Sequence, residues 1–372
     1  MSGHDQSIVN ELLDFLDTHL PRFRAEYGER TDFAASRAWQ RQLDIGGWVG
    51  LDWPAEYGGR ALNLATHVAC EAALSESGAP QIAGFIGVNT VAAAIMHLGS
   101  PEQKQYLPGI RSAELLFCQG FSEPGAGSDL ASLRTRASVG SDGFVLDGQK
   151  VWTSHGAEGD QCLVLARTTP VDSNGRSPRG LSLFLVPLDV PGVTVAPIMQ
   201  LNGGAEFAEL FFDSVSLPRT ALLGPLDDGW RAAMSTLAHE RAAAMMLAMR
   251  TRAQVRNVTG QHMRTVPAYR RDDLLRLYVE SEVLGLLAER SIAEIGAGTV
   301  GPAQSLVKLS WSQVDQQYAE LIFDLRGAAA ASGLAPAATD ALLFSRSSTI
   351  AAGTTEVMKN ILSEQVLALP RS

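Results

Sequence analysis

Ser122-Glu123-Pro124-Gly125-Ala126-Gly127-Ser128-Asp129, followed further along by Lys150-Val151-Trp152-Thr153-Ser154, is the part of the sequence that decides the fold and the chemistry. The glycines of the first stretch allow positive φ angles and a close approach of the backbone to a ligand. Its two serine hydroxyl groups and free backbone N–H groups can form a concavity that holds an anion such as a pyrophosphate. The tryptophan of the second stretch offers a flat apolar wall for a ring system. Together the two stretches predict a flavin site.

Each of these residues, taken alone, also fits a plainer structure. A turn rich in glycine and proline commonly joins two strands, and a tryptophan commonly lies in a hydrophobic core. The flavin interpretation therefore depends on the combination of a Gly-Ala-Gly-Ser loop with a Trp-Thr-Ser loop in one region of the chain.

The pattern of apolar residues divides the chain into three parts. Residues 6–110 show helical periodicity, and helical periodicity returns after Pro225 and persists to the end. Between them lie short β-prone runs separated by Gly, Pro, Asp and Ser, at residues 143–147, 161–167, 181–187, 193–198 and 208–213. A polar loop is predicted at 169–180. This order predicts an α+β multidomain protein with a helical domain over 1–112, a β domain over 113–224 and a second helical domain over 225–372.

Composition excludes some classes of function. The 372 residues are 46% hydrophobic with a mean hydropathy of +0.04, which is enough for a sizeable core shared among two or three domains. A formal net charge of -10, a pI near 5.2 and the lack of a Lys/Arg cluster argue against a nucleic-acid or anionic-membrane partner.

The cysteines and the first residues bear on the compartment. Cys70, Cys118 and Cys162 are few, widely separated and odd in number, which fits a reducing compartment and offers no metal-ligand spacing. The first thirty residues lack a signal-peptide core, and no apolar run reaches the roughly 18 residues that suggest a membrane span. A cytoplasmic location is therefore expected, with no disulfide and no metal site.

The chain resembles the acyl-CoA dehydrogenase family over nearly its whole length. Besides the two loops, the resemblance is carried by landmarks in the family's order: Gly47-Trp48, Trp53-Pro54-Ala55-Glu56-Tyr57-Gly58-Gly59, His239-Glu240-Arg241, Gly353-Thr354-Thr355-Glu356 and Leu367-Ala368-Leu369-Pro370-Arg371. It implies an N-terminal helical domain, a middle β-barrel-like domain and a C-terminal four-helix bundle. That order agrees with the α, β, α pattern described above.

The resemblance also implies a cofactor, because the two loops hold FAD in that family. The residues that it implies as the lining of FAD are Phe121, Ser122, Gly127, Ser128, Trp152, Thr153 and Ser154. It places the nucleotide half of FAD near Thr354 and Glu356, and near Gly327, where a helix end approaches the dinucleotide. Asp324 and Arg326 depart from the commoner neutral pattern around that glycine. A simple helix cap is the alternative for Thr354.

The family's catalytic base is a carboxylate that removes the α-proton of a thioester while the β-hydrogen leaves as a hydride. Many members carry it just before the Gly-Thr of the C-terminal landmark, where this chain has Ala352, which cannot accept a proton. Isovaleryl-CoA dehydrogenase-like and sterol side-chain dehydrogenase-like members instead carry it on the first helix of the C-terminal domain, directly before an Arg. Glu240, followed by Arg241, occupies that place. The resemblance therefore implies that Glu240 is the base.

The residues around Glu240 agree with this role. On a helix predicted over roughly 228–252, apolar residues from Ala233 to Leu247 recur at helical spacing, and Glu240 falls on the same stripe. Burial without a cation would raise the pKa of this carboxyl group, which suits a base at neutral pH. The alternative is that Glu240 pairs with an Arg or Lys of another helix. Arg241 either orients the base or contacts the thioester, or is a buried structural cation.

One departure from the family bears on assembly. Many members carry an Arg-x-x-Phe-Gly segment after the base-bearing helix, and it contributes to the FAD of a neighbouring subunit. The corresponding region from Arg250 to Arg271 contains no Phe. Either another residue takes the place of the Phe, or the neighbouring chain is a different one that supplies this half of the site. We therefore expect a tetramer, either of identical chains or with a homologous subunit.

These points together predict FAD-dependent α,β-dehydrogenation of an acyl thioester, carried by CoA or by a carrier protein, as in lipid metabolism. Electrons would then pass to an electron-transferring flavoprotein. Two alternatives remain: a monooxygenase on the same scaffold that uses reduced flavin and oxygen, and a noncatalytic subunit of a heteromeric dehydrogenase. The carboxylate of Glu240 argues against the first, and the intact flavin loops argue against the second.

Overall fold

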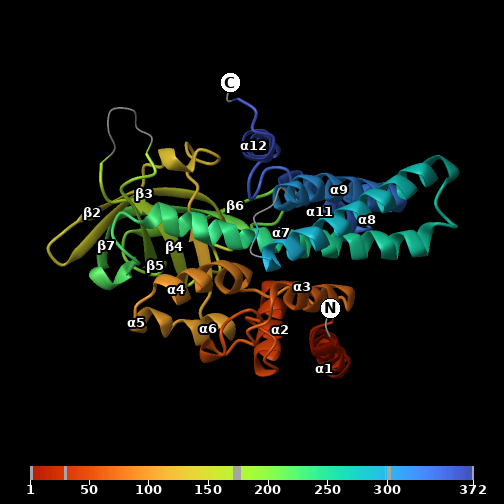
Figure 1. Cartoon of the computed structure of the whole chain (residues 1–372), viewed down its shortest axis with the longest axis horizontal. Helices are drawn as coiled ribbons and strands as arrows, with labels where there is room; N and C mark the ends of the chain where they lie inside the picture. Colours follow the sequence, from red (N-terminus) through yellow and green to blue (C-terminus); the bar gives the residue numbers. More distant parts are fainter. Residues whose placement is uncertain (1–2, 29–31, 171–176, 298, 300–302, 371–372) are drawn as a thin grey trace. The chain divides into compact units, whose positions relative to one another are not determined.

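The computed structural model (Figure 1) describes residues 3–28, 32–170, 177–297, 299 and 303–370. Within these ranges, the side chains of residues 3–4, 235–243 and 365 lie outside the described part. The predicted polar loop at 169–180 falls partly on residues 171–176, which also lie outside it.

The chain divides into two compact units. We call one the helical unit; it consists of Met1–Leu20, Leu62–Ala79 and Arg241–Ser372. The other, which we call the sheet unit, consists of Pro21–Ala61 and Pro80–Glu240 and contains every strand of the described residues. Helices at both ends of the sequence with a sheet between them confirm the predicted α+β fold class.

Three of the helices that precede the sheet begin at a polar side-chain cap, whereas those that begin after Val91 and Tyr106 have none. Asp32 accepts a hydrogen bond from the Ala35 N–H at the start of α2, and Ser100 forms a capping box with Gln103 at the start of α5. These helices are α1 Gly3–Tyr27, α2 Phe33–Ile45, α3 Leu64–Glu76, α4 Ala92–Leu98, α5 Pro101–Lys104 and α6 Leu107–Arg111. The Gln103 amide donates to the carbonyls of Thr220 and Leu222, at 2.8 and 3.0 Å, and so ties α5 to the end of the sheet.

The sheet is mixed, with strand order β6-β7-β3-β2-β4-β5-β8 and β1 paired in parallel with β4. Its strands are β1 Phe117–Gly120, β2 Arg136–Val139, β3 Gly143–Ser154, β4 Gln161–Arg167, β5 Leu181–Pro187, β6 Val193–Ile198, β7 Phe207–Pro218 and β8 Leu222–Leu223. Alternating side chains such as Phe144, Leu146, Phe184 and Leu210 form its buried core.

The predicted strands at 161–167, 181–187 and 193–198 are confirmed as β4, β5 and β6. Those at 143–147 and 208–213 are parts of longer strands, because β3 and β7 pair along their length through two register shifts that absorb polar and glycine positions. The short strands β1, β2 and β8 were not predicted. In β2 only Ala137 is buried, so that strand carries almost no apolar pattern.

The helices after the sheet are α7 Gly229–His262, α8 Ala268–Gly296, α9 Ala303–Arg326, α10 Ala328–Ala331, α11 Pro336–Phe344 and α12 Thr355–Ile361. In the helical unit, α7 and α8 form a long hairpin, and α9 packs along α8 (Figure 1). Their core includes Met245, Val255, Leu284 and Leu321. α7 is longer than the predicted helix at 228–252, because no proline lies between Pro225 and Pro267 to interrupt it.

Among the described residues, no helix has both the length and the apolar character that crossing a membrane requires.

Arg252, Arg256 and Glu282 hold α7 to α8. The Glu282 carboxylate accepts hydrogen bonds from both guanidinium groups, at 2.5 Å from Arg256 Nε and 2.7 Å from Arg252 Nη2. These bonds lower the pKa of Glu282 to about 2. Gly285 leaves room for the arginine, since a Cβ there would come within 2.4 Å of Arg252 Cδ.

We expect this network to make the helical unit sensitive to acid. Because the pKa of Glu282 is lowered by folding, its stabilisation is present above its ordinary pKa of 4.5 and is lost as the pH falls from there towards about 2. Glu282→Gln should lower the thermal midpoint at pH 7 and flatten its decline below pH 4.5. Glu289→Gln, which removes a more exposed partner of Arg252, should change both much less. Equal pH profiles for wild type and Glu282→Gln would contradict the account.

Candidate functional site

The loop after β1 is closed by its own backbone. The Glu123 N–H donates to the Ala126 carbonyl at 3.1 Å, and the Ala126 N–H donates back to the Glu123 carbonyl at 3.0 Å. A Cβ built on Gly125 or Gly127 would meet no atom within 4 Å, so the loop faces open space there. Neither glycine has a positive φ. The loop therefore does not use the positive φ that glycine allows, and what the two glycines provide is open space beside the backbone.

Trp152 lies at an irregular point of β3. The pairing of β3 with β7 shifts register between Lys150 and Thr153, and Trp152 there has a φ of +59°. Its side chain is 59% exposed, and its ring meets Phe207 edge-on, with centroids 6.1 Å apart. A left-handed backbone at an aromatic residue costs free energy, and such strain concentrates at functional sites. The distortion turns a large flat ring out of the sheet.

The two loops are joined directly. The Val151 N–H donates to the Ser122 carbonyl at 3.0 Å, which holds the glycine loop beside the strand that carries Trp152. Phe121 is buried at the base of the loop, whereas Gly127 and Ser128 are exposed. Seven of the predicted site residues, from Phe121 to Ser128 and from Trp152 to Ser154, thus come together in the sheet unit.

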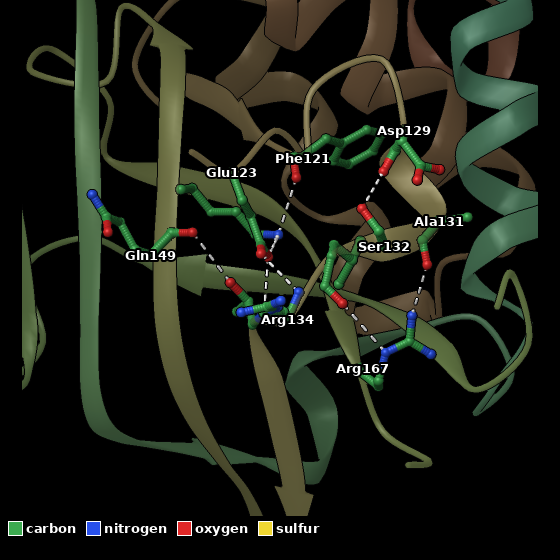
Figure 2. Close-up of polar contacts among 11 residues, drawn as sticks. Phe121, Glu123, Asp129, Ala131, Ser132, Arg134, Gln149 and Arg167 are labelled. Atoms are coloured by element: carbon green, nitrogen blue, oxygen red, sulfur yellow. Dashed lines mark hydrogen bonds and ion pairs between the residues drawn. The ribbon is translucent and has the colours of Figure 1, made fainter. Parts of the chain in front are cut away.

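Glu123 and Lys150 hold the glycine loop through a buried ion pair; Figure 2 shows Glu123 with Phe121 and Arg134 beside it. The fully buried Lys150 donates to the Glu123 carboxylate at 2.8 Å and to the Phe121 carbonyl at 3.0 Å. The same carboxylate accepts the backbone N–H groups of Arg134 and Thr135, at 2.7 and 2.9 Å. Burial alone would raise the pKa of Glu123, but Lys150 and these bonds outweigh it and lower the pKa, so the carboxylate stays charged.

Burial also lowers the pKa of Lys150, against the attraction of Glu123. Three hydrogen bonds to the Glu123 carboxylate favour its charged form directly.

Arg167 at the end of β4 extends this anchor (Figure 2). Its guanidinium donates to the carbonyls of Ala131 and Leu133, which follow the glycine loop, and to those of Ser177 and Arg179. Backbone carbonyls that no strand pairs are thereby satisfied by a side chain.

The roles of Glu123, Lys150 and Arg167 were not predicted from the sequence. A signal for one of them exists, because Lys150 shares the alternation of Phe144 and Leu146 and so falls on the inward face of its strand. A lysine at such a position needs a buried partner.

Gly327, Thr354 and Glu356 belong to the helical unit. Gly327 follows the last residue of α9 with a φ of +50°. The Thr354 side chain caps α12 by accepting a hydrogen bond from the Val357 N–H at 3.2 Å, and Glu356 lies exposed in the first turn. The helix cap expected as the alternative for Thr354 is thus present.

Comparison with known proteins places the chain in a family. Models of the N-terminal, middle and C-terminal domains of acyl-CoA dehydrogenases match residues 2–114, 118–215 and 227–367. Acyl-CoA dehydrogenase IpdE1 of Mycobacterium tuberculosis is 38% identical over 352 residues, which are 92% of this chain and 90% of that protein. The chain belongs to the acyl-CoA dehydrogenase family. The predicted family and enzyme class are thereby confirmed.

Other members of the family are similar over comparable lengths. Acyl-CoA dehydrogenase IpdE1 of Mycolicibacterium smegmatis is 36% identical over 92% of this chain and 90% of its own. Among solved structures, the Tcur3481-Tcur3483 steroid ACAD has a TM-score of 0.88 at 28% identity and covers 100% of this chain and 99% of its own. The ChsE4-ChsE5 complex from Mycobacterium tuberculosis has a TM-score of 0.83 at 27% identity, with the same coverage.

FAD is the general cofactor of acyl-CoA dehydrogenases, and the sheet unit offers features that fit it. The Thr153 hydroxyl is fully buried and has no hydrogen-bond partner among the described residues. A buried polar atom without a partner is costly, and a bound ligand would relieve that cost. The exposed Trp152 ring and the open space at Gly125 and Gly127 supply a wall and a cradle beside it.

Glu240 and Arg241 lie on α7, but their side chains fall outside the described part, as does that of His239. The described positions nearby correct one supporting argument. Met245, Ala248 and Val255 are buried, whereas the flanking Ala244 and Leu247 are only half-buried. Over 244–255 the buried face is thus offset by about one residue from the predicted stripe, whereas Ala233, at the start of that stripe, is buried as predicted. The assignment of Glu240 therefore rests on its place beside Arg241 in the family.

The strain at Trp152 allows a direct test. Trp152→Gly should leave the thermal midpoint of the protein unchanged or slightly higher, because glycine adopts a positive φ without strain and the ring that is lost is largely exposed. FAD affinity should fall about two- to twelvefold, which corresponds to the loss of an aromatic contact of about 0.5–1.5 kcal/mol. Phe207→Leu, which keeps Trp152, is the control. A destabilised Trp152→Gly with unchanged FAD affinity would show that the ring serves the fold instead.

Proposed function

We propose that this chain catalyses the FAD-dependent α,β-dehydrogenation of an acyl-CoA thioester to the 2-enoyl thioester. The observation that carries the proposal is the exposed, left-handed Trp152 next to the unpartnered, buried Thr153 hydroxyl, on a strand tied to the glycine loop. The stability of the sheet does not require this combination. Binding of FAD, the cofactor of the family, would explain both the exposed ring and the unpartnered hydroxyl.

In this proposal the glycine loop and the tryptophan loop hold FAD. When FAD is bound, it supplies the acceptor for the hydride that leaves the β-carbon of the substrate. The lining consists of Phe121, Ser122, Gly127, Ser128, Trp152, Thr153 and Ser154, with Gly327, Thr354 and Glu356 at the nucleotide half. Lys150 and Glu123 do not contact the cofactor; they keep both loops in place.

Glu240 removes the α-proton of the thioester, and Arg241 orients this base. The proton and the hydride together account for the two hydrogens that distinguish the acyl from the enoyl product. Ala352 supports this assignment, because the family's other position for the base is filled here by a residue that cannot accept a proton.

The proposed substrate is a CoA thioester with a bulky acyl group, such as one derived from a steroid. The similar Tcur3481-Tcur3483 structure is that of a steroid ACAD, and the base on the first C-terminal helix resembles sterol side-chain dehydrogenases. A carrier-protein thioester is the alternative carrier. An electron-transferring flavoprotein is the proposed acceptor, and the cytoplasm is the proposed location.

The active assembly is proposed to be a tetramer that includes a homologous chain. On α8, Leu275, Val279, Val283 and Leu286 form an apolar stripe in which each side chain is 44–58% exposed. An exposed apolar stripe of this kind marks an interface between chains. This chain has no Phe between Arg250 and Arg271, the region that contributes to a neighbouring FAD site in the family. We propose that a homologous partner chain supplies this contribution and completes the FAD site. The similar ChsE4-ChsE5 structure is itself a complex of two different chains.

The FAD content per subunit tests this proposal. We expect the chain purified alone to hold little FAD, and coexpression with a homologous acyl-CoA dehydrogenase chain to give a yellow tetramer that contains both. A flavin-loaded homotetramer would contradict the need for a partner but support the flavin site. A colourless protein in every combination would contradict the proposed function, and a complex whose FAD is held only by the partner would assign this chain a noncatalytic role.

A further inference from the structure

The helical unit contains a buried cluster of polar groups that none of the proposed chemical steps uses. Lys308 and Asp315 lie two turns apart on the same face of α9. The Lys308 ammonium donates to the Ser348 carbonyl at 2.7 Å, and the Ser348 hydroxyl donates to the Asp315 carboxylate at 2.6 Å. Lys308 and Ser348 are 6% and 4% exposed. Ser348, in the segment after α11, is therefore held by hydrogen bonds at both its carbonyl and its hydroxyl group.

Burying the charged groups of Lys308 and Asp315 costs free energy, although together they hold only one residue, Ser348. Among the described residues no ion pair is formed by Lys308: its ammonium donates to the neutral Ser348 carbonyl and lies 5.4 Å from the centre of the Trp311 ring, and Asp315 attracts it without direct contact. Burial lowers the pKa of Lys308 to about 8 and raises the pKa of Asp315. Buried charges of this kind are uncommon unless the position of their partner matters.

The contacts continue from the cluster to the start of α12. Gln316, next to Asp315, donates its amide to the Ser345 carbonyl at 3.1 Å and to the Thr349 hydroxyl at 3.3 Å. The Thr349 carbonyl in turn accepts the Thr355 N–H at 3.0 Å. Thr355 is the first residue of α12, and the preceding Thr354 is its cap. The beginning of α12 is thus hydrogen-bonded, through this segment, to α9.

The turn between Thr349 and Thr355 is strained, so the position of α12 depends on how the two ends of this turn are held. Ala352 and Gly353 have φ angles of +52° and +95°. A Cβ on Gly353 would come within 2.6 Å of the Met358 Cε. Such a turn costs free energy at the alanine and needs glycine at the next position, so it persists only where its two ends are held.

We propose that Lys308 and Asp315 are positioning residues of the flavin site, which clamp the Ser345–Thr349 segment to α9 and thereby fix Thr354 and Glu356. The proposal rests on the proposed function, in which those two residues lie at the nucleotide half of FAD. The clamp acts through backbone position, and neither Lys308 nor Asp315 touches the cofactor.

The test compares Lys308→Met and Asp315→Leu with Glu320→Gln in the full chain, together with its partner chain where that is needed to hold FAD. Glu320 is a matched control, because it ties the same segment to the same helix through an exposed ion pair with Arg346. Two quantities are measured: amide hydrogen exchange of the peptide over 345–361, and FAD affinity by titration of the deflavinated protein.

We expect both clamp variants to raise exchange at Thr355 and its neighbours and to weaken FAD binding about tenfold or more, with a thermal midpoint close to that of the wild type. Lys308→Arg, which keeps the donor, should restore both quantities, whereas Glu320→Gln should change neither. Restoration by Arg separates positioning from a merely structural role.

Unchanged exchange over 345–361 in both clamp variants would overturn the clamp. Raised exchange with unchanged FAD affinity would overturn the link between this segment and FAD. If the wild-type assembly binds no FAD at all, the proposed function fails and the flavin role of the clamp falls with it. The exchange data of the same samples would then still report whether Lys308 holds the segment, so the two failures are distinguishable.

Discussion

Glu240→Gln is expected to leave FAD bound and to lower the rate of flavin reduction by the acyl-CoA substrate by roughly 10²- to 10⁴-fold, the range that a positioned general base contributes. Glutamine has nearly the same shape as glutamate but cannot accept the α-proton at neutral pH. Because the lining proposed for FAD does not include Glu240, the FAD content per subunit should match that of the wild type. Anaerobic stopped-flow absorbance measures the rate.

Asp272→Asn, which neutralises an exposed carboxylate on α8, is the control for a general effect of charge. It should reduce flavin at the wild-type rate. Fast reduction in Glu240→Gln would exclude Glu240 as the base and would direct attention to another carboxylate. Loss of FAD together with activity would mean that Glu240 is structural, paired with a cation of another helix.

Lys150→Met is expected to have the largest effect on the flavin loops. It leaves the Glu123 carboxylate buried without its cation and the Phe121 carbonyl without its donor. Removing one partner of a buried ion pair costs about 3–5 kcal/mol. The sheet unit should therefore lose stability in denaturant unfolding. The flavin-loaded protein, together with its partner chain where that is needed, should lose its FAD because the glycine loop is no longer held beside Trp152.

A second substitution distinguishes loss of the pair from loss of the lysine. In Lys150→Met/Glu123→Gln the buried position carries no charge, and the glutamine oxygen can still accept from the N–H groups of Arg134 and Thr135. The double variant should therefore be more stable than Lys150→Met alone, and a double-mutant cycle measures the coupling. Additive effects of the two substitutions would show that Glu123 and Lys150 do not act as one anchor.

Much of the architecture follows from the period of the apolar residues. Strands with continuous apolar runs, such as Leu181–Pro187, are predictable because each is buried on both faces. The strands β2 and β8 are not, because one carries a single buried residue and the other is two residues long. The bulge that turns Trp152 outwards is likewise invisible, since it depends on how β3 pairs with β7.

The candidate site shows the same division. Residues that a loop presents, such as Gly127, Ser128 and Trp152, can be proposed from residue type and order along the chain. The Glu123–Lys150 pair, by contrast, joins positions whose proximity only the folded sheet creates. The apolar stripe on α7 is too broad for its phase to be read from sequence, and for that reason Glu240 rests on family position and not on the stripe.

The most direct test of the central claim is anaerobic titration of the flavin-loaded protein, alone or with its partner chain, with acyl-CoA thioesters of increasing bulk. The account predicts that the flavin absorbance bleaches on addition of a matching thioester and that the corresponding 2-enoyl thioester forms in equal amount. A flavin that stays oxidised with every thioester, and reacts only when reduced and exposed to oxygen, would contradict it.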